Sequence, residues 1–185
     1  FLLPLLKGCR VVYAGKTPTP AVLQRICDRE KPQVMLVVPL IIEKIYKKRV
    51  APAVEKSKML SFFCRFSLSR RMIYRKIGAK LTAFFGNNLE VMGIGGAALN
   101  PEVELFLRDA GFPFIVGYGL TEAGPVVAVR NLSTLEAGTV GTAFPGMEIK
   151  LIDEDGKECK PGEMGVIHCR SAQVMKGYYN DPEST

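Results

Sequence analysis

The stretch 117–122 reads Gly-Tyr-Gly-Leu-Thr-Glu and combines residue types that can bind a phosphorylated ligand. Thr121 offers a hydroxyl that can hydrogen-bond a phosphate oxygen, and Glu122 offers a hard carboxylate oxygen that suits Mg2+. Tyr118 supplies an aromatic face on which a flat base can stack. Gly117 and Gly119 allow a tight turn and the close approach of a ligand. If this stretch is considered alone, a strand and tight turn with an incidental Thr-Glu pair explains it about as well as a phosphate-binding site does.

Two short segments rich in small residues follow two expected strands. The apolar run Phe114–Val116 is typical of a buried strand, and the Thr-Glu stretch follows it directly. Residues 89–94 predict another strand, which ends in Gly95, Gly96, Ala97 and Ala98. Small side chains at such an end leave room for a flat ring against the backbone. A glycine-rich turn without a ligand would explain this second segment alone, but its place beside the Thr-Glu stretch favours a nucleotide site.

The order of four motifs resembles the adenylate-forming superfamily of acyl-CoA synthetases, peptide-synthetase adenylation domains and luciferases. The motifs lie at residues 93–102, 118–127, 162–165 and 177–183. The sequence Tyr-Gly-Leu-Thr-Glu-Ala-Gly-Pro-Val-Val most resembles the long-chain fatty acyl-CoA synthetases. One departure occurs at Arg170-Ser171, where the family usually continues with Arg-Gly. The resemblance implies Mg2+ as cofactor, and a fatty acid, ATP and coenzyme A as substrates.

The resemblance also implies a role for each candidate residue. Glu122 would hold Mg2+, and Thr121 would donate a hydrogen bond to the α-phosphate. The predicted nucleotide-binding residues are Gly96, Ala97, Ala98, Gly117, Tyr118, Gly119 and Thr121. A long apolar acyl pocket is expected where side chains are missing, at Gly95, Gly96, Gly117 and Gly119, so Gly119→Leu should penalise long acids more than acetate.

The predicted fold class is α/β, a parallel-rich sheet with flanking helices followed by the start of an antiparallel β-barrel subdomain. Residues 1–133 are expected to form the α/β subdomain, and residues 134–185 the beginning of the β-rich one, where glycines and prolines separate short strands. Asp155-Gly156 predicts a hairpin turn between a half-buried strand over 147–153 and a partner strand over 164–169.

Local signals place the remaining elements. Residues 9–13 predict a short strand, and residues 33–38 predict a strand buried on both faces. Thr19 before Pro20 predicts the start of a helix, as does Asn100 before Pro101. Glu102 and Glu104 are interpreted as charges favoured at a helix start rather than as catalytic acids.

Composition indicates a folded chain without a membrane span. The 185 residues are 48% hydrophobic, and no apolar run is long enough to cross a bilayer. The five cysteines and single histidine show no metal-site spacing, so reduced cysteines and a cytoplasmic location are expected, with peripheral membrane contact as an addition. No sequence motif for nucleic-acid binding is recognised, and no nucleic-acid partner is expected.

The net charge of +7 is concentrated in one region, the basic helical segment at about residues 40–81. Between residues 40 and 80 there are twelve Lys and Arg against two Glu. Met59, Phe63, Phe66, Ile73 and Ile77 recur there at helical spacing. Three interpretations remain open: a solvated surface packed by its apolar stripe, a surface for anionic lipid, or attraction of phosphorylated ligands such as coenzyme A.

The resemblance also implies that parts of the active site lie outside these residues. The family's phosphate-binding loop would precede Phe1, and the ribose-binding aspartate and catalytic lysine would follow Thr185. The chain by itself is therefore expected not to synthesise acyl-CoA. Two other functions stay open: adenylation of an aryl or amino acid, and a non-catalytic module of the same fold that binds nucleotide or lipid.

Overall fold

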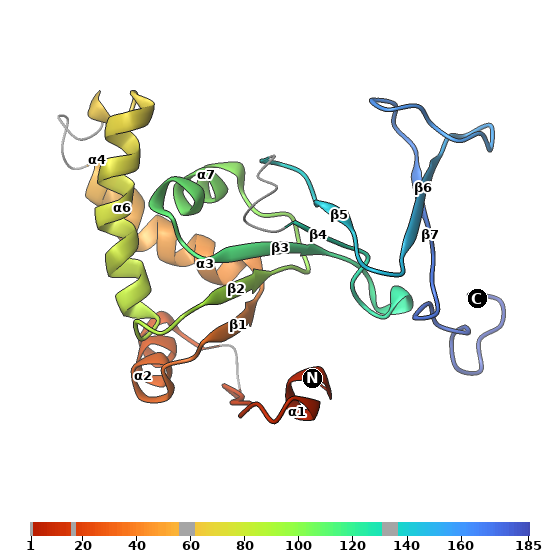
Figure 1. Cartoon of the computed structure of the whole chain (residues 1–185), viewed down its shortest axis with the longest axis horizontal. Coiled ribbons are helices and arrows are strands. Elements are labelled where there is room, and N and C mark those ends of the chain that lie inside the picture. The colour runs from red at the N-terminus through yellow and green to blue at the C-terminus, as the bar shows by residue number, and fades with distance from the viewer. Residues whose placement is uncertain (1, 16–17, 56–61, 131–136) are drawn as a thin grey trace.

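The computed structural model describes residues 2–15, 18–55, 62–130 and 137–185. Helices surround one end of a five-stranded sheet, and a separate two-stranded ribbon extends away from it (Figure 1). The helical elements are α1 (Leu2–Leu6), α2 (Pro20–Glu30), α3 (Pro39–Ile45), a π-helix (Tyr46–Val50), α4 (Ala51–Glu55), α6 (Ser67–Phe84), α7 (Pro101–Ala110) and a 3-10 turn (Thr121–Ala123). The strands are β1 (Val34–Val37), β2 (Val91–Ile94), β3 (Phe114–Tyr118), β4 (Ala128–Arg130), β5 (Thr142–Ala143), β6 (Glu148–Ile152) and β7 (Val166–Arg170).

The larger sheet has the order β1-β2-β3-β4-β5, and its first three strands are parallel. β4 and β5 continue the sheet in antiparallel register. The predicted α/β class with a parallel-rich sheet is therefore confirmed. The predicted boundary at residue 133 lies outside the described residues, so the two-part division stays a prediction.

The edge strand β1 corrects the expectation of a strand buried on both faces. Leu36 is 80% exposed, and Val34 is exposed as well. Met35 and Val37 point the other way and pack against the main core. The apolar run therefore reflects a strand with one face on the core and one face that no described residue covers.

The strand predicted near the N-terminus is also absent from the described structure. Residues 9–13 form no strand, because none of their backbone groups pairs with a described strand. The helix signals that follow are confirmed, since the Thr19 hydroxyl accepts a hydrogen bond from the Val22 N–H at 3.4 Å. Lys31 then ends α2 in the left-handed conformation, with φ at 45°.

Helix α6 packs along α7, and the contact includes a buried carboxylate. Asp109 on α7 is buried and accepts a hydrogen bond from Arg70 Nε at 2.6 Å. Arg70 interrupts the apolar spacing of α6 because it binds this carboxylate. The buried face of α6 consists of Tyr74, Gly78, Leu81 and Phe84. The predicted stripe is partly wrong: Ile73 and Ile77 pack against the core, whereas Phe63 and Phe66 are exposed, and Met59 lies outside the described residues.

Helix α7 sits between the sheet and α6 and leads into β3. Its start is confirmed, because the Asn100 side chain accepts hydrogen bonds from the N–H groups of Glu102 and Val103. Gly111 in the left-handed conformation ends the helix. Glu104 is buried and pairs with Arg130 of β4 at 2.7 Å. The glutamate therefore links the helix to the sheet, a structural role consistent with its predicted lack of catalysis.

The ribbon of β6 and β7 is antiparallel, as predicted. The half-buried pattern expected for β6 is wrong, because four of its five residues are exposed. Met147, immediately before β6, is the buried residue and packs with Ala123 and Val127 in a small second core. This second core joins the ribbon to the turn that contains Thr121 and Glu122.

Candidate functional site

The candidate site lies where the parallel strands β2 and β3 reach their carboxyl ends. Because neighbouring parallel strands end at the same edge of a sheet, the loops after them meet there. Gly95 and Gly117 mark the contact: a Cβ added at Gly95 would lie 3.0 Å from the Gly117 carbonyl oxygen. The fold thus brings together the two segments that the sequence analysis predicted to be neighbours.

The loop after β2 exposes backbone and small side chains. Gly96 has a φ of 85°, a conformation that residues with a Cβ rarely adopt. Gly96, Ala97 and Ala98 are all exposed, and Leu99 then turns into the core. Gly117 at the end of β3 faces open space, because a Cβ added there meets no atom within 4 Å. These positions leave a flat, unobstructed surface at the sheet edge.

At Gly119, unlike Gly117, the loop itself leaves no room for a side chain. A Cβ there would lie 1.8 Å from the Pro125 carbonyl oxygen of its own loop. The chain therefore needs glycine at this position to fold the turn, whatever ligand lies nearby. Tyr118 is half-buried and packs against the second core of Ala123, Val127 and Met147, so part of its ring is occupied by the protein.

Thr121 and Glu122 lie at the start of the 3-10 turn that follows β3. Within the part of the chain that the structure describes, the Thr121 hydroxyl makes no hydrogen bond to another residue, and Thr121 is exposed. Glu122 Oε1 accepts a hydrogen bond from the Tyr178 hydroxyl at 2.6 Å. This bond lowers the pKa of the Glu122 carboxyl and raises the pKa of the Tyr178 phenol. The turn therefore presents a hydroxyl and an ionised carboxylate side by side.

A later segment, residues 173–178, holds this turn in place, and we call it the clasp. The Gln173 side-chain amide donates hydrogen bonds to the carbonyls of Ala123 at 2.9 Å and Val126 at 2.7 Å. The Met175 N–H donates to the Glu122 carbonyl at 2.8 Å. Together with the Tyr178 bond, these contacts fix both the backbone and the carboxylate of the turn.

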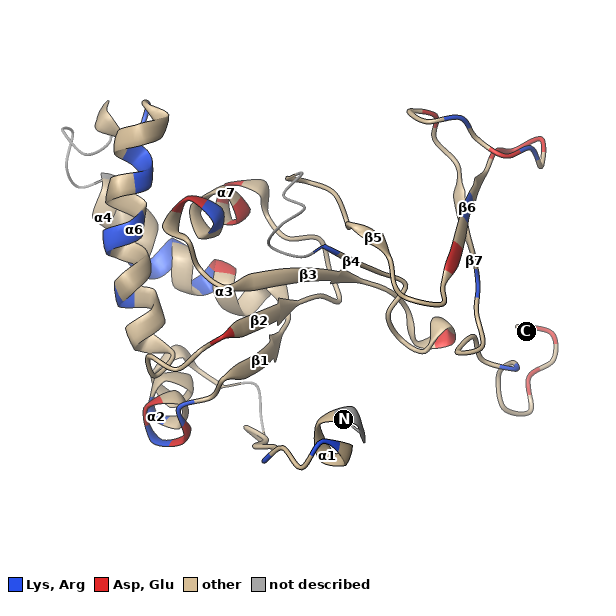
Figure 2. Cartoon of the chain, viewed as in Figure 1, with Lys and Arg blue, Asp and Glu red and all other residues tan. Residues whose placement is uncertain are grey.

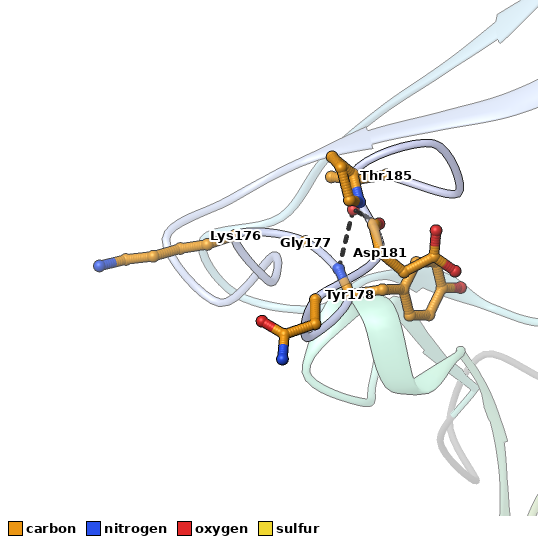
Figure 3. Close-up of a pocket in the computed structure, with 7 residues that line it drawn as sticks. Lys176, Gly177, Tyr178, Asp181 and Thr185 are labelled. Atoms are coloured by element: carbon orange, nitrogen blue, oxygen red, sulfur yellow. Dashed lines mark hydrogen bonds between the residues drawn. The ribbon is translucent and has the colours of Figure 1, made fainter.

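Figure 3 shows Tyr178 extending toward the 3-10 turn from a tight C-terminal loop. The Tyr178 N–H donates a hydrogen bond to the Thr185 hydroxyl at 2.9 Å, which closes that loop. A shallow hollow of about 420 Å³ lies within it, lined by Lys176, Gly177, Tyr178, Asn180, Asp181, Pro182 and Thr185. Of the residues that line the hollow, Tyr178 bonds to the Thr-Glu turn.

The sequence analysis missed the clasp. Gln173 and Tyr178 lie 50 and 56 residues from their partners in the turn, and no local pattern connects them. The motif at 177–183 supported the family resemblance but gave no role for Tyr178. Only the tertiary fold shows that this motif returns to Glu122.

The side chains near the turn offer few ligands for Mg2+. Among the described residues, no group of three or more His, Cys, Asp or Glu side chains could hold a metal ion. Mg2+ is commonly bound through one or two carboxylates together with substrate phosphates. A single, partly exposed, ionised carboxylate fits that second arrangement, and Glu122 is such a group.

The chain matches the AMP-binding enzyme family over residues 1–179 and belongs to that family. It is 38% identical over 120 residues to a long-chain-fatty-acid–[acyl-carrier-protein] ligase of Arabidopsis thaliana, covering 64% of this chain and 16% of that protein. It is 37% identical over 93 residues to a long-chain-fatty-acid–CoA ligase of Haemophilus influenzae, covering 49% of this chain and 16% of that protein. The chain thus spans only a small part of the length of these relatives.

The fold also resembles a solved benzoate CoA ligase from Burkholderia xenovorans. The TM-score is 0.71 at 22% identity, and the match covers 97% of this chain and 31% of that one. This likeness supports the fold class, including the mostly parallel sheet with flanking helices. The two relatives are named for long-chain fatty acids and the solved structure for benzoate.

Proposed function

We propose that the full-length protein is an ATP-dependent long-chain fatty acid–CoA ligase. The observation that carries the proposal is the open sheet edge at which Thr121 and an ionised Glu122 are presented by a clasped turn. Membership of the AMP-binding enzyme family supports adenylation as the reaction class. The two long-chain relatives support a fatty acid as the carboxylate.

The reaction has two displacement steps. A carboxylate oxygen of the fatty acid attacks the α-phosphorus of ATP, and the bond to the β-phosphate breaks to release pyrophosphate. The thiolate of coenzyme A then attacks the acyl carbon and displaces AMP. No residue of this chain is needed as a nucleophile, because the substrate supplies one in each step.

The residues of the site bind and orient the reacting groups in this proposal. Thr121 donates a hydrogen bond to an oxygen of the α-phosphate, where negative charge increases during attack. Glu122 holds Mg2+, which when bound offsets negative charge on the phosphate oxygens. Tyr118 flanks the adenine, and Gly96, Ala97 and Ala98 form the wall beside it. Gly96 and Gly117 leave room for the acyl chain, whereas Gly95 is also required by the close approach of the Gly117 carbonyl and Gly119 by its own loop.

The test is to incubate the full-length protein with ATP, Mg2+, palmitate and coenzyme A and to measure AMP and palmitoyl-CoA. Formation of both supports the proposal. Exchange of labelled pyrophosphate into ATP with benzoate or an amino acid, but not with palmitate, would instead identify a different adenylating enzyme. Nucleotide or fatty-acid binding without AMP release would identify a non-catalytic binding module.

A second candidate concerns the acceptor thiol rather than the acid. The Arabidopsis relative is named as a ligase for acyl carrier protein, whereas the Haemophilus relative is named for CoA. Replacing coenzyme A by phosphopantetheinylated acyl carrier protein in the same assay distinguishes the two. The acceptor that gives the higher kcat/KM is the one the enzyme uses.

A further inference from the structure

A group of apolar side chains is exposed at the beginning of α6, and we call it the apolar tip. It consists of Phe62, Phe63, Phe66, Leu68 and Met72. Leu68 is 78% exposed and Met72 68% exposed, one helical turn apart on the same face. The ring of Phe62 contacts those of Phe63 and Phe66 edge-on, at centroid distances of 5.9 and 5.8 Å. The aromatic rings thus pack on one another while remaining open to solvent.

The apolar tip is surrounded by positive charge. Residues 62–84 include six Lys and Arg and no Asp or Glu. Figure 2 shows the basic positions along α6 without an acidic one among them. Arg71, Arg75, Lys76 and Lys80 are exposed on the side of the helix that continues from Leu68 and Met72. Arg70 is turned inward to Asp109, so it does not belong to this outer surface.

Asp109 is the acidic group that faces these cations from the neighbouring helix. It is buried and lies 2.6 Å from Arg70 and 3.6 Å from Arg71. One buried carboxylate cannot neutralise the outer cations, of which Arg75, Lys76 and Lys80 have no ion-pair partner among the described residues. The outer face of α6 therefore combines exposed apolar groups with uncompensated positive charge.

We propose that this face of α6 docks on an anionic lipid bilayer. Amphipathic helices that lie in a membrane interface place apolar and aromatic side chains among the acyl chains and basic side chains at the headgroups. The apolar tip and the four cations of α6 match both requirements on one continuous face. Phe, Met and Arg also occur at protein interfaces, but Lys is depleted there, and a face that carries four cations and no acidic residue requires an anionic partner. Charge complementarity thus favours an anionic lipid surface.

No described helix is long and apolar enough to cross a bilayer, so contact through α6 would be peripheral. The proposal does not depend on the catalytic activity proposed above, because the site of docking and the Thr-Glu turn share no residue. Its test therefore measures binding alone. A protein that fails to ligate palmitate can still dock, and an active ligase can fail to dock.

The experiment measures co-sedimentation of the full-length protein with vesicles of phosphatidylcholine alone or mixed with phosphatidylglycerol. Each basic residue near an anionic surface contributes about 1 kcal/mol, or roughly a fivefold change in partitioning. The triple variant Arg71→Gln, Arg75→Gln, Lys76→Gln should therefore bind the anionic vesicles about 100-fold less tightly. A matched variant, Arg25→Gln, Lys157→Gln, Lys160→Gln, makes the same charge change on exposed residues elsewhere and should bind nearly as well as the wild type.

A second pair of variants tests the apolar tip. Leu68→Ser with Met72→Ser should lower binding about tenfold by removing buried apolar area. The control Met164→Ser, at a 94% exposed position of the ribbon, should leave binding unchanged. Circular dichroism and gel filtration of each variant confirm that it is folded.

Three results would overturn the proposal. The first is equal binding to neutral and anionic vesicles, and the second is no binding to either. The third is an equal loss in the α6 and control charge variants, which would show an effect of net charge rather than of this face. Binding that persists at about 0.5 M salt would also contradict the electrostatic part, since the Debye length is then well below 8 Å.

Discussion

The two loops at the sheet edge differ in what holds them. The loop after β2, residues 95–99, has small exposed residues and donates one backbone hydrogen bond to the sheet, from Gly95 to Val37 at 3.2 Å. The loop after β3, residues 119–126, is bonded by the clasp through the backbone carbonyls of Glu122, Ala123 and Val126 and through the Glu122 side chain. The loop after β2 leaves space beside the sheet edge, and the loop after β3 carries the Thr121 hydroxyl and the Glu122 carboxylate. Functional groups that must be oriented thus depend on a segment far along the chain, whereas an empty surface does not.

The largest expected effect tests whether the clasped loop carries the chemistry. Glu122→Gln in the full-length enzyme keeps the side-chain shape but removes the negative charge. Adenylation measured by pyrophosphate exchange should fall by about 100-fold, or roughly 3 kcal/mol, as for loss of a preorganised electrostatic group. Glu154→Gln, at an exposed position whose side chain pairs with no described residue, is the matched control. An unchanged rate for Glu122→Gln at saturating ATP and Mg2+ would show that other groups bind the metal.

The next prediction tests whether Gly119 lacks a side chain because of its own loop or because a ligand binds there. Gly119→Ala places a Cβ 1.8 Å from the Pro125 carbonyl oxygen, so the loop must shift. We expect thermal unfolding to show a loss of about 1–3 kcal/mol. Activity with palmitate and acetate should fall together, because the distorted turn affects every acid.

Gly117 provides the complementary test of the acyl pocket, since a side chain there meets open space. Gly117→Leu should change the free energy of unfolding by less than about 0.5 kcal/mol. If the acyl chain passes this position, kcat/KM for palmitate should fall at least tenfold more than for acetate, an estimate based on steric selection in apolar pockets. Equal losses for both acids would assign Gly117 to the nucleotide instead.

A smaller effect is expected from loosening the clasp itself. Gln173→Ala removes two hydrogen bonds to the carbonyls of Ala123 and Val126, at about 1 kcal/mol each. Amide hydrogen exchange over residues 121–127 should become faster, while exchange over residues 95–99 stays unchanged. Faster exchange in both loops would show general destabilisation, and no change in either would show that Gln173 does not hold the turn.

The sequence allowed the α/β class, the helix caps and the pairing of the two loops to be predicted because each depends on local patterns. Thr19 and Asn100 predict helix starts because their side-chain oxygens can cap the first N–H groups, and apolar runs predict the strands. The strand over residues 33–38 was predicted to be buried on both faces and β6 to be half-buried, and both are more exposed, because an apolar pattern does not reveal how many faces are covered. The clasp could not be predicted, because a tyrosine 56 residues away binds Glu122 only after the chain has folded.

The smallest expected effect compares two adjacent tyrosines. Tyr178→Phe removes the hydroxyl that donates to Glu122 Oε1. Tyr179 is 93% exposed and its side chain bonds to no described residue, so Tyr179→Phe is the control. A hydrogen bond to a charged acceptor stabilises that charged form, so its loss should raise the Glu122 carboxyl pKa in Mg2+-free protein, as measured by carbon NMR. The orienting role should also appear as weaker binding of ATP in the presence of Mg2+, by a few-fold to about tenfold in calorimetry, corresponding to roughly 1 kcal/mol. Binding of ATP in the presence of chelator should not change, because the Thr121 hydroxyl and the open edge remain. Equal effects of the two variants would mean that Tyr178 supports the C-terminal loop and does not orient the carboxylate.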